Sequence, residues 1–131
     1  MSLPPFRHNN DAPIPDDIEV NQSKKLLTLR YENGRVITLP FELMRVYSPS
    51  AEVVGHGPGQ ETLQTGKRHV GLIGLEPIGN YALQPQFSDG HDSGFFTWSY
   101  LQWLGEHQDA LWEDYLKRLE AAGGSRDPAS G

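Results

Sequence analysis

The segment LTLRYENGRVITLP, residues 27–40, carries the pattern on which the fold of this chain depends. Apolar and polar residues alternate on both sides of the turn signal Asn33-Gly34, as in two strands that each bury one face. Pro40 has no backbone N–H and is expected to end the second strand. The segment therefore predicts a β-hairpin whose buried side chains are Leu27, Leu29 and Tyr31 before the turn and Ile37 and Leu39 after it.

The length of the hairpin loop decides which residues face each other. A two-residue loop would pair Leu29 with the polar residue Thr38, whereas a three-residue loop, residues 32–34, would pair Leu29 with Ile37. Paired residues share a face, so only the longer loop puts the aliphatic side chains of both strands on one side. We therefore predict the three-residue loop, with Gly34 in a left-handed conformation.

Further elements are expected on either side of a long loop, residues 48–66. One or two helical turns follow Pro40 and end before Pro49, where the chain can no longer continue a helix. After the loop, the sequence predicts a three-stranded meander at 70–75, 81–87 and 95–97, a helix capped by Thr97 at 98–104, and a last helix at 108–122. The fold class is α+β: a small antiparallel sheet, made of the hairpin and the meander, with short helices at one end and a C-terminal helix.

The ends of the chain have a different composition from its middle. Residues 1–20 hold four prolines among Asn and Asp, and residues 123–131 read GGSRDPASG. Such segments bury too little apolar surface to offset the entropy lost on ordering. We expect a disordered Pro-rich arm at 1–20, a single domain at 21–122 and a disordered tail at 123–131.

Composition excludes several classes of function. The chain has 131 residues, a net charge of −6 and no cysteine. The acidic balance disfavours nucleic-acid binding, and the lack of cysteine excludes disulfides and thiolate metal ligands. No stretch approaches the ~20 apolar residues of a membrane span, and the first residues do not resemble a secretory signal. A cytoplasmic location without membrane insertion is expected.

Three motifs suggest binding chemistry, and each has a plainer structural interpretation. The glycine-rich stretch 55–60 lacks the spacing of a phosphate loop and is better interpreted as a connector. Residues 89–92, Asp-Gly-His-Asp, could supply metal ligands but are typical of a tight turn. His107 and Asp109 match the first two ligands of a non-haem iron triad, yet no histidine follows them. The candidate binding loop consists of His56, Gly57, Pro58, Gly59, Asp89 and His91.

Aromatic residues concentrate in the last third of the chain, where most of them are expected in the core. At helical spacing, however, they cannot all face the same way. A partly exposed tryptophan would suit a protein interface. The candidate interface residues are Trp98, Trp103 and Trp112.

An ordered series of short motifs resembles the gamma-butyrobetaine-hydroxylase-like N-terminal domain family, over roughly residues 24–106. These are the hairpin 29–39, then 43–45, then 48–53 with 55–59, then 79–82, then Asp89-Gly90-His91, and last 98–104. The resemblance implies a relation to the carnitine-pathway hydroxylases, in which such a domain precedes a separate jelly-roll domain that holds iron and 2-oxoglutarate. Related domains are attached to P-loop ATPases of iron–sulfur cluster assembly.

The resemblance also implies a zinc site, which this chain does not retain. In the hydroxylases, the domain binds zinc through Cys-x-Cys-x-x-Cys and a later histidine. The matching positions here are Ser48, Ser50, Val53 and His91, of which only the histidine is a zinc ligand. We therefore expect no structural zinc, and a hydrogen bond from His91 across to the Ser48 segment.

These observations predict a non-catalytic binding or adaptor domain that acts through a protein partner and uses no cofactor. The alternative is a metal-binding accessory domain of an oxygenase or an iron–sulfur assembly system, with His91 and nearby acids as ligands. The chain is not expected to be an enzyme on its own, because it lacks the catalytic jelly-roll domain. We expect a monomer or a weak homodimer.

Overall fold

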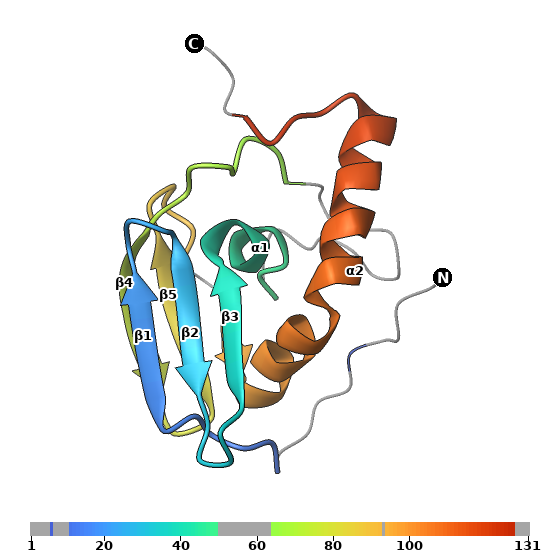
Figure 1. The fold of residues 1–131 in the computed structure, drawn as a ribbon. Helices are drawn as coiled ribbons and strands as arrows, with labels where there is room; N and C mark the ends of the chain where they lie inside the picture. The colour runs from blue at the N-terminus through green and yellow to red at the C-terminus, as the bar shows by residue number, and fades with distance from the viewer. Residues whose placement is uncertain (1–5, 7–10, 50–63, 93, 128–131) are drawn as a thin grey trace.

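The computed structural model describes residues 6, 11–49, 64–92 and 94–127. Within these residues, the fold consists of two antiparallel sheets of three strands and two helices (Figure 1). In chain order the elements are β1 (Asp17–Asn21), β2 (Leu26–Arg30), β3 (Val36–Pro40), α1 (Phe41–Val46), β4 (Leu72–Ile78), β5 (Ala82–Phe87), β6 (Phe96–Thr97) and α2 (Trp98–Ala122). The α+β class predicted from the sequence is confirmed, with the strands divided between two sheets.

The β2–β3 hairpin has the predicted register. Leu29 lies opposite Ile37, and Leu27 lies opposite Leu39. The loop holds three residues: the backbone N–H of Tyr31 donates to the carbonyl of Arg35 at 2.9 Å, and Gly34 has a φ of 85°. A left-handed residue at this point has little steric cost only when it is glycine.

Strand β1 is an addition to the predicted fold. The sequence predicts a disordered arm up to residue 20, but residues 17–21 pair antiparallel with β2, with Ile18 opposite Leu29. The exposed side of β1 is polar, and its acids Asp17 and Glu19 bind Arg30 at 2.8 and 2.7 Å. The sequence of residues 17–21 gives little local signal for a strand, because the strand is ordered by its hydrogen bonds to β2.

The meander β4-β5-β6 is confirmed, with one shift in its boundaries. The sequence predicts a first strand that ends at residue 75, whereas β4 continues through Pro77 to Ile78. The turn follows at Gly79, which has a φ of 52°, and Tyr81 lies in it rather than in the strand. Proline is tolerated in β4 because this strand is at the edge of its sheet.

The two sheets and both helices share one hydrophobic core. In Figure 1 the sheet of β4 and β5 lies behind that of β1–β3, and α2 runs beside β3. The fully buried side chains come from every layer: Leu27, Leu29 and Leu39 from the first sheet, Phe87 and Phe96 from the second, Phe41 and Met44 from α1, and Leu101, Leu104 and Leu111 from α2. No helix within the described ranges combines the length and apolar character needed to cross a bilayer.

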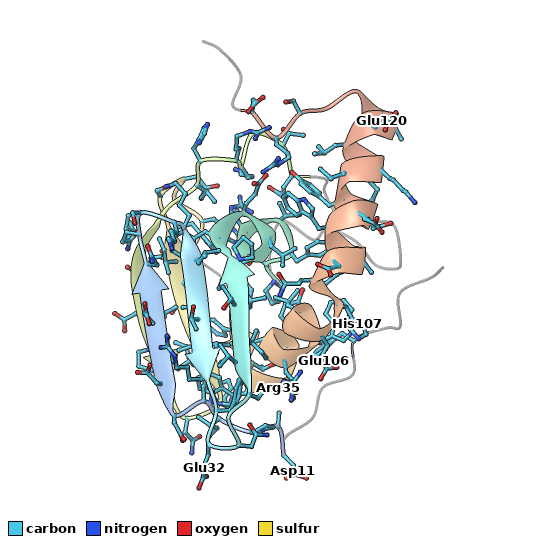
Figure 2. All side chains as sticks on the ribbon, in the orientation of Figure 1. Asp11, Glu32, Arg35, Glu106, His107 and Glu120 are labelled. Carbon is cyan, nitrogen blue, oxygen red and sulfur yellow. The ribbon has the colours of Figure 1, made fainter. Side chains whose placement is uncertain are left out.

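Helix α2 contains both helices predicted from the sequence, at 98–104 and 108–122, joined across a kink. Thr97 caps it as expected, because its hydroxyl accepts the backbone N–H of Tyr100 at 3.2 Å. The predicted stop at Gly105 is absent. The helix bends at His107 instead, where φ is −116° and ψ is 15°. Figure 2 shows His107 at this bend, beside Glu106, whose carboxylate pairs with Arg35 of the hairpin at 3.2 Å.

The described part of the tail, residues 123–127, packs back onto the domain. Gly123 ends α2 with a left-handed φ of 68°, and the N–H of Gly124 donates to the carbonyl of Leu119 at 2.8 Å. Beyond this point, the carbonyl of Ser125 accepts the N–H of Gly66 at 2.9 Å. The sequence predicts disorder for this segment; the structure differs because the donors that hold the tail lie some sixty residues earlier in the chain.

Candidate functional site

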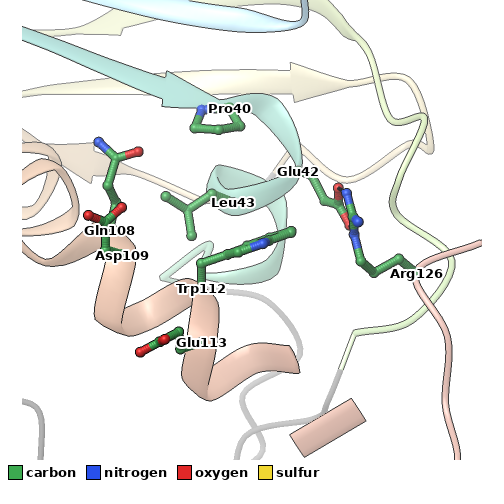
Figure 3. Close-up of a pocket in the computed structure, with 8 residues that line it drawn as sticks. All are labelled: Pro40, Glu42, Leu43, Gln108, Asp109, Trp112, Glu113 and Arg126. Carbon is green, nitrogen blue, oxygen red and sulfur yellow. Dashed lines mark hydrogen bonds and ion pairs between the residues drawn. The ribbon is translucent and has the colours of Figure 1, made fainter. Parts of the chain in front are cut away.

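A groove lies between the end of β3, helix α1, the second half of α2 and the C-terminal tail (Figure 3). Its cavity has a volume of about 660 Å³. The residues that line it are Pro40, Glu42, Leu43, Gln108, Asp109, Trp112, Glu113 and Arg126. We call this cavity the β3–α2 groove.

The groove combines an apolar floor with an acidic rim. Leu43 is buried and Trp112 is half-buried, so both offer apolar surface to the cavity. Asp109 and Glu113 are exposed and stand one helical turn apart on α2. Gln108 is turned to the domain, where its side-chain amide donates to the carbonyl of Thr38 at 3.0 Å. The groove can therefore hold an apolar group with a positively charged neighbour.

One end of the groove is closed by a guanidinium from the tail. Nε and Nη2 of Arg126 donate to the two carboxylate oxygens of Glu42 at 2.8 and 2.7 Å. The Glu42 side chain is only 8% exposed, and the guanidinium carbon lies 4.8 Å from the centre of the Trp112 ring. Hydrogen bonding to Glu42 raises the pKa of Arg126 above its ordinary value. Sequence reasoning missed this pair, because 84 residues separate its members and no local pattern links them.

A second polar cluster joins the turn after β5 to the end of α1. Oδ2 of Asp89 accepts Nε of Arg45 at 2.8 Å and Nζ of Lys67 at 2.6 Å. Burial acts to raise the pKa of Asp89, but these hydrogen bonds outweigh it and lower the pKa to about 2. The carboxylate thus fixes the turn that carries His91, whose backbone N–H donates to Oδ1 of Asp89 at 3.2 Å.

Two of the four positions that match the family's zinc ligands meet beside this cluster. The hydroxyl of Ser48 lies 2.9 Å from Nε2 of His91, and both side chains are buried. The predicted hydrogen bond between His91 and the Ser48 segment is therefore confirmed. Ser50 and Val53, and the candidate binding-loop residues 56–59, lie outside the described residues.

The residues present do not fit a zinc ion. The Ser48 hydroxyl is a poor zinc ligand, and it is hydrogen-bonded to Nε2 of His91. Val53 offers no donor. Within the described ranges, no three His, Cys, Asp or Glu side chains come close enough to hold a metal ion. The Ser48–His91 contact is a hydrogen bond that joins two loops.

The three candidate interface tryptophans lie in different surroundings. The indole N–H of Trp98 donates to the carbonyl of Asn80 at 2.8 Å, at the β4–β5 turn. Trp103 stacks on Tyr100 with ring centres 5.8 Å apart, and its buried Nε1 has no hydrogen-bond partner among the described residues. Only Trp112 lines the β3–α2 groove. Trp112 is thus the one of the three candidate interface residues that lies at this cavity.

The two iron-triad residues are also separated by the structure. His107 lies at the bend of α2 with its ring 5.7 Å from that of Trp103, while Asp109 is exposed at the rim of the groove. His107 therefore contacts an aromatic ring, and Asp109 belongs to the acidic rim of the groove.

Solved structures include close relatives of this chain. Two proteins known from NMR solution structures are 52% and 41% identical to it, with TM-scores of 0.78 and 0.80. The first alignment covers 92% of this chain and 94% of the relative, and the second covers 96% and 94%. A crystal structure of a DUF971-family protein with unknown function, from Acidithiobacillus ferrooxidans ATCC 23270, is 36% identical, covers 70% of this chain and 91% of its own, and has a TM-score of 0.57.

No curated protein matches the chain. The family model for the N-terminal domain of gamma-butyrobetaine hydroxylase-like proteins matches residues 18–102, from β1 to the first turns of α2. This range includes the hairpin, the Ser48–His91 contact and the meander. The chain belongs to the gamma-butyrobetaine hydroxylase-like N-terminal domain family.

Proposed function

We propose that this domain is a non-catalytic binding module that docks a segment of a partner protein in the β3–α2 groove. The observation that carries the proposal is the groove itself, in which an apolar floor, a partly exposed tryptophan and an acidic rim come together. Its volume of about 660 Å³ lies within the range of small-ligand sites and would hold a few side chains.

The chemistry of the groove selects the kind of segment. Trp112 is a residue type that dominates binding energy at protein interfaces when a partner covers it. Asp109 and Glu113 add two negative charges that are not engaged in the core, on a chain whose net charge is −6. A partner segment with an apolar residue for the floor and a basic residue for the rim complements both features.

A selection from a displayed random peptide library, with the intact chain immobilised, tests this proposal. We expect enriched peptides that combine an apolar or aromatic residue with Lys or Arg. The double charge reversal Asp109→Lys with Glu113→Lys should abolish the enrichment, because both residues are exposed and their replacement repels a basic segment.

The matched control is the double variant Glu32→Lys with Glu76→Lys, which changes the same charge at exposed positions outside the groove. It should select the same peptides as the wild-type chain. Failure to enrich any motif, or an enrichment that survives the rim reversal and is lost in the control, would contradict docking in the groove.

A further inference from the structure

We propose that the end of the β3–α2 groove formed by Glu42 and Trp112 is an arginine subsite, and that Arg126 occupies it in cis until an arginine of a partner segment replaces it. The inference deepens the proposed function and rests on it. The C-terminal tail, residues 123–127, then acts as a built-in competitor for the partner.

The geometry of the subsite matches a guanidinium. Glu42 accepts two parallel hydrogen bonds from Arg126, at 2.8 and 2.7 Å, so the carboxylate meets the planar fork of the side chain. The Trp112 ring lies 4.8 Å from the guanidinium carbon and provides a cation–π contact. A lysine ammonium could not form the paired hydrogen bonds and would be a poorer occupant.

The burial of Glu42 explains why the subsite needs a cation. Its side chain is 8% exposed, and a buried carboxylate without a partner is strongly destabilising. Release of Arg126 alone is therefore unfavourable, whereas exchange for another arginine restores both the ion pair and the ring contact. The free energy of exchange is then decided by the remaining contacts that the partner makes along the groove.

The tail is held by few contacts and buries no apolar side chain. Gly123, Gly124 and Ser125 are exposed, as is the pair that Asp127 forms with Arg68. Beyond the helix cap at Gly123 and Gly124, the tail is attached by backbone hydrogen bonds from the N–H of Gly66 to Ser125 and from the N–H of Arg68 to Arg126, both at 2.9 Å. Apart from the Glu42–Arg126 pair, little burial therefore opposes the opening of this segment.

An incoming extended segment can use the same backbone donors as the tail. The N–H groups of Gly66 and Arg68 lie in a loop and donate to the carbonyls of two consecutive tail residues, Ser125 and Arg126, so they can donate in the same way to two consecutive carbonyls of an incoming segment. Its arginine would then reach Glu42 and Trp112, while adjacent residues lie along Leu43 toward the acidic rim (Figure 3). In this proposal, the partner segment makes the same contacts with Glu42, Trp112, Gly66 and Arg68 that the chain's own tail makes in the structure.

The test uses the chain's own tail as a probe. A synthetic peptide with the sequence GGSRDPASG, residues 123–131, is titrated into the full-length Arg126→Ala variant and into the wild-type chain. Amide signals of Gly66 and Arg68 and the indole signal of Trp112 are followed by NMR. We expect these signals to shift in Arg126→Ala, with binding at least about tenfold weaker in the wild-type chain, where the cis arginine competes at an effective concentration of order millimolar.

Two peptide variants and two further protein variants make the readout specific. Peptides with Lys or Ala in place of arginine should bind Arg126→Ala at least about tenfold more weakly, since each loses the forked ion pair. Arg30→Ala, which removes an exposed paired arginine on β2, should behave like the wild-type chain. If Arg126→Ala does not fold, Arg126→Lys retains a charge beside Glu42 and should bind the arginine peptide more tightly than the wild-type chain does.

Equal binding of the arginine and alanine peptides, or equal binding by Arg126→Ala and the wild-type chain, would overturn the arginine subsite. So would the absence of any shift at millimolar peptide in both Arg126 variants. If the peptide library is enriched without a preference for arginine while the tail peptide fails, the subsite is refuted and groove docking stands. If the tail peptide binds but the library enriches nothing, the subsite stands and the proposed partner docking is refuted.

Discussion

At the scale of single residues, Asp89 connects the turn after β5 to two cations that come from other parts of the chain. Burial acts to raise its pKa, and the hydrogen bonds from Lys67 and Arg45 lower it from 3.8 to about 2. Because the folded pKa is depressed, the ionised carboxylate stabilises the fold above about pH 4. This stabilisation is lost as the pH falls from about 4 to about 2.

We expect Asp89→Asn to lower the free energy of unfolding at pH 7 by about 2 kcal/mol, since it leaves the buried Arg45 guanidinium without its carboxylate. The difference from the wild-type chain should shrink between pH 4 and pH 2. Urea unfolding at pH 7, 4 and 2 measures both effects, and the exposed Asp92→Asn serves as the control. A difference that persists unchanged at pH 2 would show that Asp89 acts through packing rather than charge.

At the scale of elements, the contact between α2 and β3 depends on the lack of a side chain at Gly105. A Cβ at this position would lie 2.5 Å from Cγ2 of Ile37 and 3.2 Å from two further atoms of that side chain. Ile37 is buried, so it has little room to move. Helix propensity alone would favour alanine over glycine by about 1 kcal/mol.

We therefore predict that Gly105→Ala destabilises the domain by roughly 1–3 kcal/mol, because overpacking exceeds the gain in propensity. Thermal and urea unfolding measure the change. Ala110→Gly, at an exposed position of the same helix, should cost about 1 kcal/mol through propensity alone. The double variant Gly105→Ala with Ile37→Ala should lose less free energy of unfolding than the sum of the losses in the two single variants. A gain in stability for Gly105→Ala alone would contradict the close contact with Ile37.

At the scale of the whole molecule, we expect the fold to be independent of zinc. The Ser48–His91 hydrogen bond joins two loops directly, and Ser48 and Val53 are not zinc ligands. Elemental analysis of protein purified without chelator should find less than stoichiometric zinc, and EDTA should leave Tm unchanged. One zinc per chain, or a large fall in Tm on chelation, would refute this prediction.

We also expect no oxygenase turnover by this chain alone. A 2-oxoglutarate oxygenase holds iron with two histidines and one carboxylate, and no histidine follows Asp109 in the sequence. Iron-dependent consumption of 2-oxoglutarate by the purified protein is the measurement. Consumption that disappears in His107→Ala would contradict the prediction, whereas consumption that persists in the variant would point to a contaminant.

Local patterns were sufficient for the elements whose order comes from adjacent residues. Alternation in residues 27–39 predicted the hairpin, and glycine's tolerance of a positive φ predicted the loop with Gly34 at 85°. The Thr97 cap was predicted for the same reason, since its hydroxyl satisfies a backbone N–H only three residues away. In the site, the family resemblance was enough to link Ser48 with His91.

Elements and site residues that depend on distant partners could not be predicted in this way. Strand β1 has a polar exposed side and is ordered by pairing with β2, and the tail is ordered by the N–H groups of Gly66 and Arg68. Alternation, turns and caps are short-range properties, so the sequence by itself determined the α+β class, the β2–β3 register and the family. The Glu42–Arg126 pair and the groove beneath it were decided only by the tertiary structure, because burial of a carboxylate requires a cation but leaves open which distant residue supplies it.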